Sequence, residues 1–129
     1  MTKAELRYLM AIDMLYDGIS GVKLTEIAAE MAVTKVSVYR AMERLEGNGY
    51  IERNEKNKVI LTEKGKKTVD DYRIIVDFVL LQFKRYCDLP PELVYQDALG
   101  VATSLGKEIC AFISEYQTGS MKQKKADSK

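Results

Sequence analysis

The stretch LTEIAAEMAVTKVSVYRAMERLEGNGYIERNEKNKVILTEKG, residues 24–65, decides the fold of this 129-residue chain. Its first half contains two segments, 25–31 and 34–45, in which apolar side chains recur at helical spacing. Thr25 and Thr34 stand at the start of these segments, where a side-chain oxygen can cap a helix. The sequence therefore predicts two short helices joined by a tight turn.

The second half of the stretch predicts a β-hairpin. Gly47-Asn48-Gly49 ends the second helix by supplying residues that tolerate positive φ. Two short segments rich in β-formers, 50–53 and 58–61, then flank the polar turn 54–57. Two helices, a tight turn and a hairpin form the winged helix-turn-helix pattern.

The remaining segments are expected to be helical. Residues 3–17 carry an apolar stripe, Thr62 caps a long helix that ends near Cys87, and further helices follow Pro90 and Gly106. The predicted fold is mostly α. It consists of a winged helix-turn-helix DNA-binding domain (1–65), a helical dimerisation domain (66–118, with a long linking helix over 62–87) and a disordered basic tail (119–129).

Composition excludes several classes of protein. Twenty basic and nineteen acidic residues give a net charge of +1, so any electrostatic footprint must be local. The absence of histidine removes the commonest general base and metal ligand, and the chain is not expected to be an enzyme. Cys87 and Cys110 are too few for a disulfide framework and fit a reducing cytoplasm. The sequence contains no apolar run that could serve as a membrane span or secretory leader, so a cytoplasmic protein without membrane contact is expected.

A local basic surface points to DNA. Residues 34–67 hold nine Lys or Arg against five Asp or Glu, and a recognition helix presents short polar or basic side chains to the major groove. Arg40 could read guanine, and the hairpin cations could contact phosphates. The predicted DNA-binding residues are Thr34, Lys35, Val36, Ser37, Tyr39, Arg40, Arg44, Arg53, Lys56 and Lys58.

Three segments together carry a family resemblance. AELRYLMAIDMLYD (4–17), EIAAEMAVTKVSVYRAMERLEGNGYIERNEKNKVILTEKGKK (26–67) and DLPPELVYQDALGVATSLGKEI (88–109) resemble the diphtheria-toxin-repressor family of iron- and manganese-responsive regulators. The most specific part is LPPELVYQDALGVATSL, whose spacing matches that family's dimerisation helix. The resemblance covers about residues 4–117 and implies a homodimeric bacterial repressor.

The chain departs from that family at the positions of the metal ligands. The family uses acidic, His, Met or Cys side chains there, whereas the matching positions here are Arg7, Met10, Val76 or Asp77, Leu99, Ala102 and Thr103. Only Met10 and Asp77 retain a ligating atom, and one thioether with one carboxylate does not make a divalent-metal site. We therefore expect no cofactor and a metal-independent regulator.

Apolar surface on the helices at 3–17 and 91–104 predicts a homodimer, with Met10, Met14, Leu93 and Leu99 at the interface. A two-fold dimer would bind double-stranded DNA at a pseudo-palindromic operator.

Two alternatives stay open at this point. One is a winged-helix module that binds protein rather than DNA. The other is a regulator with a relocated metal site built from Asp13, Asp70, Asp71, Asp77 or Asp97.

Overall fold

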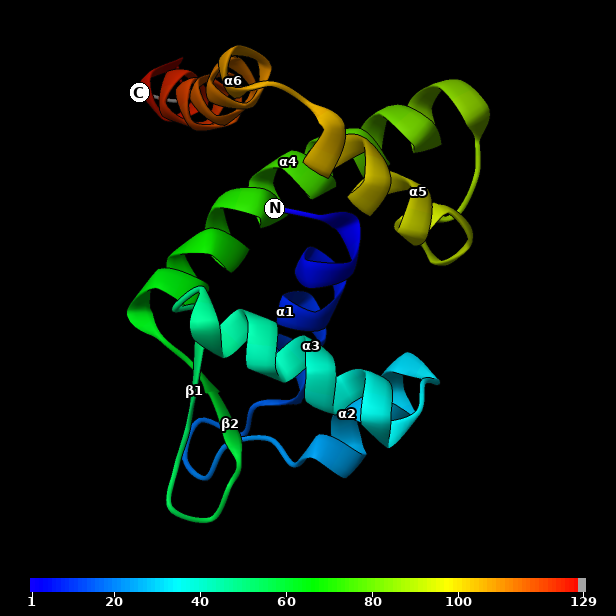
Figure 1. Ribbon diagram of the computed structural model, residues 1–129. Coiled ribbons are helices and arrows are strands. Elements are labelled where there is room, and N and C mark those ends of the chain that lie inside the picture. The colour runs from blue at the N-terminus through cyan, green and yellow to red at the C-terminus, as the bar shows by residue number, and fades with distance from the viewer. Residues whose placement is uncertain (128–129) are drawn as a thin grey trace. The chain divides into compact units, whose positions relative to one another are not determined.

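The computed structural model describes the backbone of residues 1–127 and the side chains as far as Gly119. The elements in chain order are α1 (Lys3–Leu15), α2 (Leu24–Met31), α3 (Lys35–Gly47), β1 (Ile51–Arg53), β2 (Val59–Leu61), α4 (Glu63–Cys87), α5 (Pro91–Ser104) and α6 (Lys107–Asp127), as Figure 1 shows. The chain divides into two compact units, Met1–Val69 and the residues from Asp70 onward. The fold is mostly helical with a small antiparallel sheet, as expected from the sequence.

The core of the first unit is built around α1. Leu6, Leu9 and Ile12 of this helix are fully buried, and α1 contacts α2, α3 and β2. The helix ends at Leu15, two residues earlier than expected. Tyr16, which lies within the helix expected over 3–17, is instead its C-cap residue and is exposed.

Two of the three predicted helix caps are confirmed. The Thr34 hydroxyl oxygen accepts a hydrogen bond from the Ser37 backbone N–H at 3.1 Å, and Thr62 accepts one from Gly65 N–H at 3.0 Å. The prediction for Thr25 is wrong, because α2 already begins at Leu24 with Lys23 as an N-cap that makes no side-chain bond. The chain is extended up to Lys23, and the helix starts directly after it.

The hairpin pairs Ile51 with Leu61 and Arg53 with Val59, which confirms the predicted strands in slightly shorter form. An isolated antiparallel bridge joins Val22 to Val59, with reciprocal backbone hydrogen bonds of 2.8 Å. This bridge could not be predicted from the sequence, because a single extended residue has no periodicity. It attaches the start of β2, next to the hairpin turn, to the segment between α1 and α2.

The C-terminus of α3 is held by a residue from the next helix. Asn48 is the C-cap, and Gly49 follows with a φ of +80° that a glycine adopts without strain. Lys64 Nζ donates to the Asn48 carbonyl at 2.7 Å and lies 4.7 Å from the centroid of the Tyr50 ring. A cation at this end complements the helix dipole.

In the part of the second unit that the structure describes, all regular secondary structure is helical. Its buried side chains come from α4, α5 and α6, and they are Ile75, Val76, Val79, Val94, Ala98, Leu99, Ala102 and Ile113. Helix α6 continues to Asp127, whereas the sequence predicted disorder from residue 119. Residues 128–129 of the predicted tail lie outside the described residues.

None of the helices in the described part of the chain has the length and apolar character needed to cross a bilayer.

Candidate nucleic-acid interface

The exposed face of α3 contains most of the residues predicted to contact DNA. Val38, Ala41, Met42 and Leu45 hold the helix against the core and are at most 4% exposed. The opposite face and the N-terminal turn are open, with Val36 62% and Tyr39 48% exposed. The remaining exposed residues of this surface are Thr34, Lys35, Ser37 and Arg40.

The N-terminus of α3 is well ordered by its own side chains. Besides capping the helix, Thr34 donates its hydroxyl to Ser37 Oγ at 3.0 Å. Both hydroxyls are exposed, and helix N-terminal N–H groups attract anions. This end of α3 could therefore contact a phosphate as well as a base edge.

Arg44 lies one turn beyond Arg40 and is exposed. It lines a shallow groove with Thr2, Glu5 and Tyr8, which belong to the start of the chain and to α1. The structure therefore places Arg44 beside α1, at the opposite end of α3 from Thr34.

The wing consists of residues 51–61, that is β1, β2 and their turn. Lys56 is exposed at the turn, and Lys58 is half-buried directly before β2. Both keep ammonium groups that can approach a phosphate. The two lysines and α3 belong to the same compact unit.

Arg53 is placed differently from the expectation that it grips phosphate. Its guanidinium carbon lies 5.3 Å from the centroid of the Tyr39 ring, and its Nη1 donates to Asn57 Oδ1 at 3.4 Å. Its Nε and Nη2 atoms are covered and have no hydrogen-bond partner among the described residues. Arg53 therefore connects the wing to α3, and only part of its guanidinium could reach DNA.

The wing turn is organised by Asn54, a residue that sequence reasoning missed. Its Oδ1 accepts the backbone N–H groups of Lys56 and Lys58, each at 3.0 Å. Its Nδ2 donates to the Ser20 carbonyl, also at 3.0 Å. The signal that could have revealed it is the tendency of asparagine to bond backbone groups two residues further on.

The segment that receives this bond is itself ordered by Asp17. The Asp17 carboxylate accepts the Ser20 hydroxyl and the backbone N–H groups of Ile19 and Ser20. The Ser20 hydroxyl, followed by these two N–H groups, holds the pKa of the Asp17 carboxyl well below its usual range. The α1–α2 segment and the wing turn are thus linked through Ser20.

The four predicted dimerisation residues fall into two groups. Met14 and Leu93 are 61% and 70% exposed, whereas Met10 and Leu99 are 7% and 0% exposed. Met10 and Leu99 belong to the core of the chain itself, contrary to the expectation that they face a partner. Further apolar side chains are exposed in the second unit, including Ile109, Phe112 and Tyr116.

Solved structures with a similar fold include two metal regulators. The manganese regulator SloR matches with a TM-score of 0.76 and 14% identity, and the match covers 92% of this chain and 55% of SloR. The metal-dependent transcriptional regulator MtsR matches with a TM-score of 0.75 and 15% identity, and the match covers 92% of this chain and 55% of MtsR. A hypothetical protein of Sulfolobus solfataricus, SSo2273, matches with a TM-score of 0.66 and 19% identity, and the match covers 91% of this chain and 89% of SSo2273.

The chain shares the fold of these regulators. It spans about half of the length of SloR and MtsR and nearly all of SSo2273. No protein-family model matches the sequence, and no curated protein matches it.

The positions that match the metal ligands of the resembled family carry side chains unsuited to a metal ion. In the first unit, Arg7 donates from Nη2 to the Met31 carbonyl at 3.3 Å, and Met10 is buried. In the second unit, Leu99 and Ala102 are fully buried, and the Thr103 hydroxyl donates to the Leu99 carbonyl at 2.9 Å. A cation, two hydrocarbon side chains and a hydroxyl engaged with backbone do not fit a divalent ion.

Asp77 is the remaining position with a carboxylate. It is exposed on α4 and lies near Tyr95, whose pKa is raised by burial, lowered by Arg73 and raised further by Asp77. Among the residues that the structure describes, no three Asp, Glu, Cys or His side chains form a cluster that could hold a metal ion.

Proposed function

We propose that the chain is a transcriptional regulator that binds double-stranded DNA as a homodimer. The observation that carries the proposal is the exposed N-terminal half of α3, capped by Thr34 and braced against the wing by the contact of Arg53 with Tyr39. A helix held by its apolar face, with polar and basic side chains outward, is suited to the major groove. The likeness of the fold to the transcriptional regulator MtsR supports the same function.

Within this surface, different side chains take different tasks. Arg40 is the candidate for reading a base, because a guanidinium can bond guanine through two parallel hydrogen bonds. Lys35, Lys56 and Lys58 are candidates for phosphate contacts, which add affinity and salt dependence but no sequence preference. Arg53 acts mainly by positioning the wing, since part of its guanidinium is covered.

The dimer is proposed to form through exposed apolar side chains of the second unit. Leu93, Phe112 and Tyr116 are each more than half exposed, and apolar patches of this kind mark interfaces. Two-fold symmetry would present two copies of α3 to a pseudo-palindromic operator. Leu93→Glu should convert the dimer to a monomer in sedimentation at micromolar concentration. Ile19→Glu makes the same kind of exchange, aliphatic to acidic, at an exposed site of the first unit, and it should leave the dimer intact.

The regulator is proposed to act without manganese or iron. Arg7, Leu99 and Ala102 stand where the resembled family has ligands, and a cation with two hydrocarbon side chains offers no donor to a divalent ion. Titration of Mn²⁺ and Fe²⁺ into metal-stripped protein should give no specific heat and no change in DNA affinity. A micromolar binding event that strengthens DNA binding would contradict this part of the proposal.

Selection of bound fragments from a random DNA pool tests the function as a whole. We expect a pseudo-palindromic site to emerge. Arg40→Ala should weaken binding to that site by about 1–3 kcal/mol and relax one position in each half-site. Lys56→Ala should weaken all sequences alike and lower the salt dependence by about one unit of slope.

Lys84→Ala, a change of an exposed lysine on α4 in the second unit, is the matched control and should have no effect. If no sequence is enriched and the protein is not retained on DNA at low salt, the DNA-binding proposal is wrong and a protein-binding winged helix becomes the better interpretation.

A further inference from the structure

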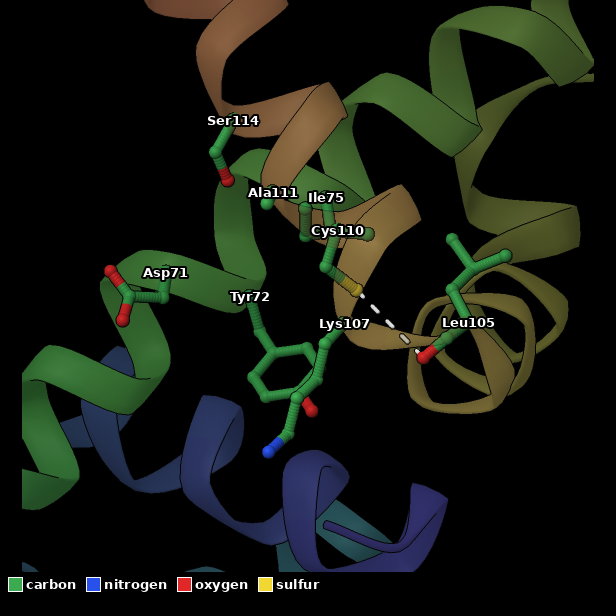
Figure 2. A pocket seen from close by; sticks show the side chains of 8 residues that line it. All are labelled: Asp71, Tyr72, Ile75, Leu105, Lys107, Cys110, Ala111 and Ser114. Carbon is green, nitrogen blue, oxygen red and sulfur yellow. Dashed lines mark hydrogen bonds between the residues drawn. The ribbon is translucent and has the colours of Figure 1, made fainter.

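Two hollows open along the boundary between α4 and α6, within the second unit. The first is a cavity near the start of α6, beside the small side chains of Cys110, Ala111 and Ser114 (Figure 2). Its acidic residue, Asp71, already has an interaction partner, and the carboxylate points away from the other lining side chains. The Cys110 thiol is directed to the Leu105 carbonyl oxygen, 3.9 Å from the sulfur, as the dashed line shows. This cavity therefore offers a ligand neither a free carboxylate nor a free thiol.

The second hollow is a groove of about 380 Å³ that lies further along both helices. Helix α4 lines it with Phe78, Leu81, Gln82 and Arg85, and the facing wall comes from α6. Residues three and four positions apart share one face of a helix, so these four side chains form one continuous wall. Small-molecule sites begin at about 300 Å³, and the groove is large enough for one.

Three aromatic rings line the groove. Phe78 on α4 and Tyr116 on α6 meet edge to face, with ring centroids 6.3 Å apart. Phe112 lies nearly parallel to Tyr116, with an interplanar angle of 18° and 6.2 Å between the centroids. Phe112 and Tyr116 are 62% and 54% exposed, so much of both rings is open to a ligand. Because aromatic rings pack favourably against one another, offset or edge to face, the groove favours a ligand that carries a ring.

The polar groups of the groove are one guanidinium and two carboxamides. Arg85 is exposed, and Gln82 and Gln117 are half-buried. Among the described residues, no hydrogen bond or ion pair engages any of these three side chains. None of the described residues that line the groove is Asp or Glu. The positive charge of Arg85 is therefore not offset from within the groove.

This free guanidinium selects an anionic ligand. A guanidinium can donate two parallel hydrogen bonds to a carboxylate, and the amides of Gln82 and Gln117 can donate further ones. An amine would be repelled by Arg85, and a neutral aromatic molecule would leave the guanidinium without an acceptor. A phosphate monoester carries nearly two negative charges at neutral pH, whereas a carboxylate matches the single charge of Arg85. Charge and ring surface together favour a carboxylate joined to an aromatic ring.

We propose that the groove between α4 and α6 binds an aromatic carboxylate. Arg85 holds the carboxylate, and the ring of the ligand packs against Phe112 and Tyr116. These two rings also belong to the apolar surface through which the dimer is proposed to form. A ring covered by the ligand is no longer open to a partner, so the ligand should weaken the dimer. That regulatory role rests on the proposed function, whereas the binding itself does not.

Calorimetric titration of the full chain with phenylacetate and 3-phenylpropionate tests the binding. At least one should bind with a dissociation constant below about 1 mM. For the acid that binds, the neutral amide should bind at least about tenfold more weakly, because it loses the charge that Arg85 recognises. The analogue with a cyclohexane ring (cyclohexylacetate or 3-cyclohexylpropionate) should bind at least about twofold more weakly, since it cannot stack. Absence of heat with both acids, or equal binding of either analogue, would overturn the proposal.

Variants show whether binding occurs in this groove. Arg85→Met removes the charge and should weaken binding at least about tenfold. Lys84→Met, at the neighbouring exposed position that does not line the groove, should bind as the wild type does. Phe112→Ala removes one ring and should weaken binding severalfold. Tyr86→Ala removes an exposed ring outside the groove and should have no effect.

All four of these positions are exposed, so each variant should fold, which a thermal melt checks. Unchanged affinity in both Arg85→Met and Phe112→Ala would overturn the assignment to the groove.

The regulatory role has its own readout. Addition of the bound acid should shift the wild type from dimer toward monomer in sedimentation at micromolar concentration, and should not shift Arg85→Met. Leu93→Glu, which is expected to be monomeric, should bind the acid at least as tightly as the wild type, because no partner competes for the rings. Binding of the acid that leaves the dimer unchanged would overturn the regulatory role and leave the site. A chain that binds the acid but is monomeric without it would count against the proposed dimer alone.

Discussion

The guanidinium of Arg53, at the end of β1, lies over the ring of Tyr39 on α3, with 5.3 Å between its central carbon and the ring centroid. This contact joins the two elements that a winged helix presents to DNA. We expect it to stabilise the folded state, since a half-covered cation–π pair contributes about 0.5–1 kcal/mol. A double-mutant cycle with Arg53→Met and Tyr39→Leu, measured by urea unfolding, should return a coupling energy of this size.

The control for this cycle pairs Arg53→Met with Tyr86→Leu, an exposed tyrosine of the second unit. Their effects should add within the error that is usual for independent sites. Purely additive effects of Arg53→Met and Tyr39→Leu would show that the contact contributes nothing to stability.

Removal of Asn54 should loosen the wing turn. Asn54→Ala loses the bonds to Lys56 N–H, Lys58 N–H and the Ser20 carbonyl, and should lower the free energy of unfolding by about 1–3 kcal/mol. Backbone amide exchange at Lys56 and Lys58 should accelerate. Glu55→Ala is the matched control: Glu55 is exposed in the same turn and no hydrogen bond of its side chain is among those described, so stability should stay within about 0.5 kcal/mol. A wing as protected in Asn54→Ala as in the wild type would contradict this account.

Gly65, near the start of α4, should not tolerate a side chain. A Cβ at this position would overlap the carbonyl oxygen of Tyr50, which also accepts the Thr62 N–H at 3.0 Å and is therefore fixed. Gly65→Ala should cost about 2–4 kcal/mol of stability in urea unfolding. Gly47→Ala should instead be neutral or gain up to about 1 kcal/mol, because a Cβ there meets no described atom within 4 Å and alanine favours the helix. Equal stability of the two variants would refute the steric argument.

Acid should weaken the segment between α1 and α2. The depressed pKa of Asp17 means that its bonds to Ser20 and Ile19 stabilise the fold fully above the ordinary carboxyl pKa of about 3.9. That contribution declines as the pH falls below this value toward the lower pKa of the folded state. Asp17→Asn should therefore be less stable than the wild type at pH 7, and the two should converge toward pH 2. Ser20→Ala should show part of the same effect, and parallel stability curves for wild type and Asp17→Asn would contradict it.

The helices and the hairpin of the first unit were accessible from the sequence because their signals are local. Apolar spacing places Val38, Met42 and Leu45 on one face of α3, and Thr34 and Thr62 cap the helices that they precede. The Val22–Val59 bridge was not predictable, since it joins residues far apart in the chain through backbone groups alone.

Parts of the candidate sites depend on partners that the sequence does not name. Arg53 looks like a phosphate contact on a hairpin until Tyr39, fourteen positions earlier, is seen beneath it. Met10 and Leu99 look like interface residues because apolarity alone does not distinguish a core from a partner surface. The cavity beside Ala111 and Ser114 could not be predicted, because small side chains make a hollow only where the facing helix leaves space.

The wing is attached on both sides of its turn, through Asn54 to Ser20 and through Val59 to Val22, and this has a practical consequence for protein engineering. Glu55 lies between these two attachment points and is exposed in the wing turn. No hydrogen bond of its side chain is among those described. Such a position accepts an inserted peptide or a bulky dye, because its surroundings keep their shape without it. After exchange of Cys87 and Cys110 for serine, Glu55→Cys offers a single thiol for a fluorophore. The emission of that fluorophore would then follow, in real time, what comes to rest against the wing.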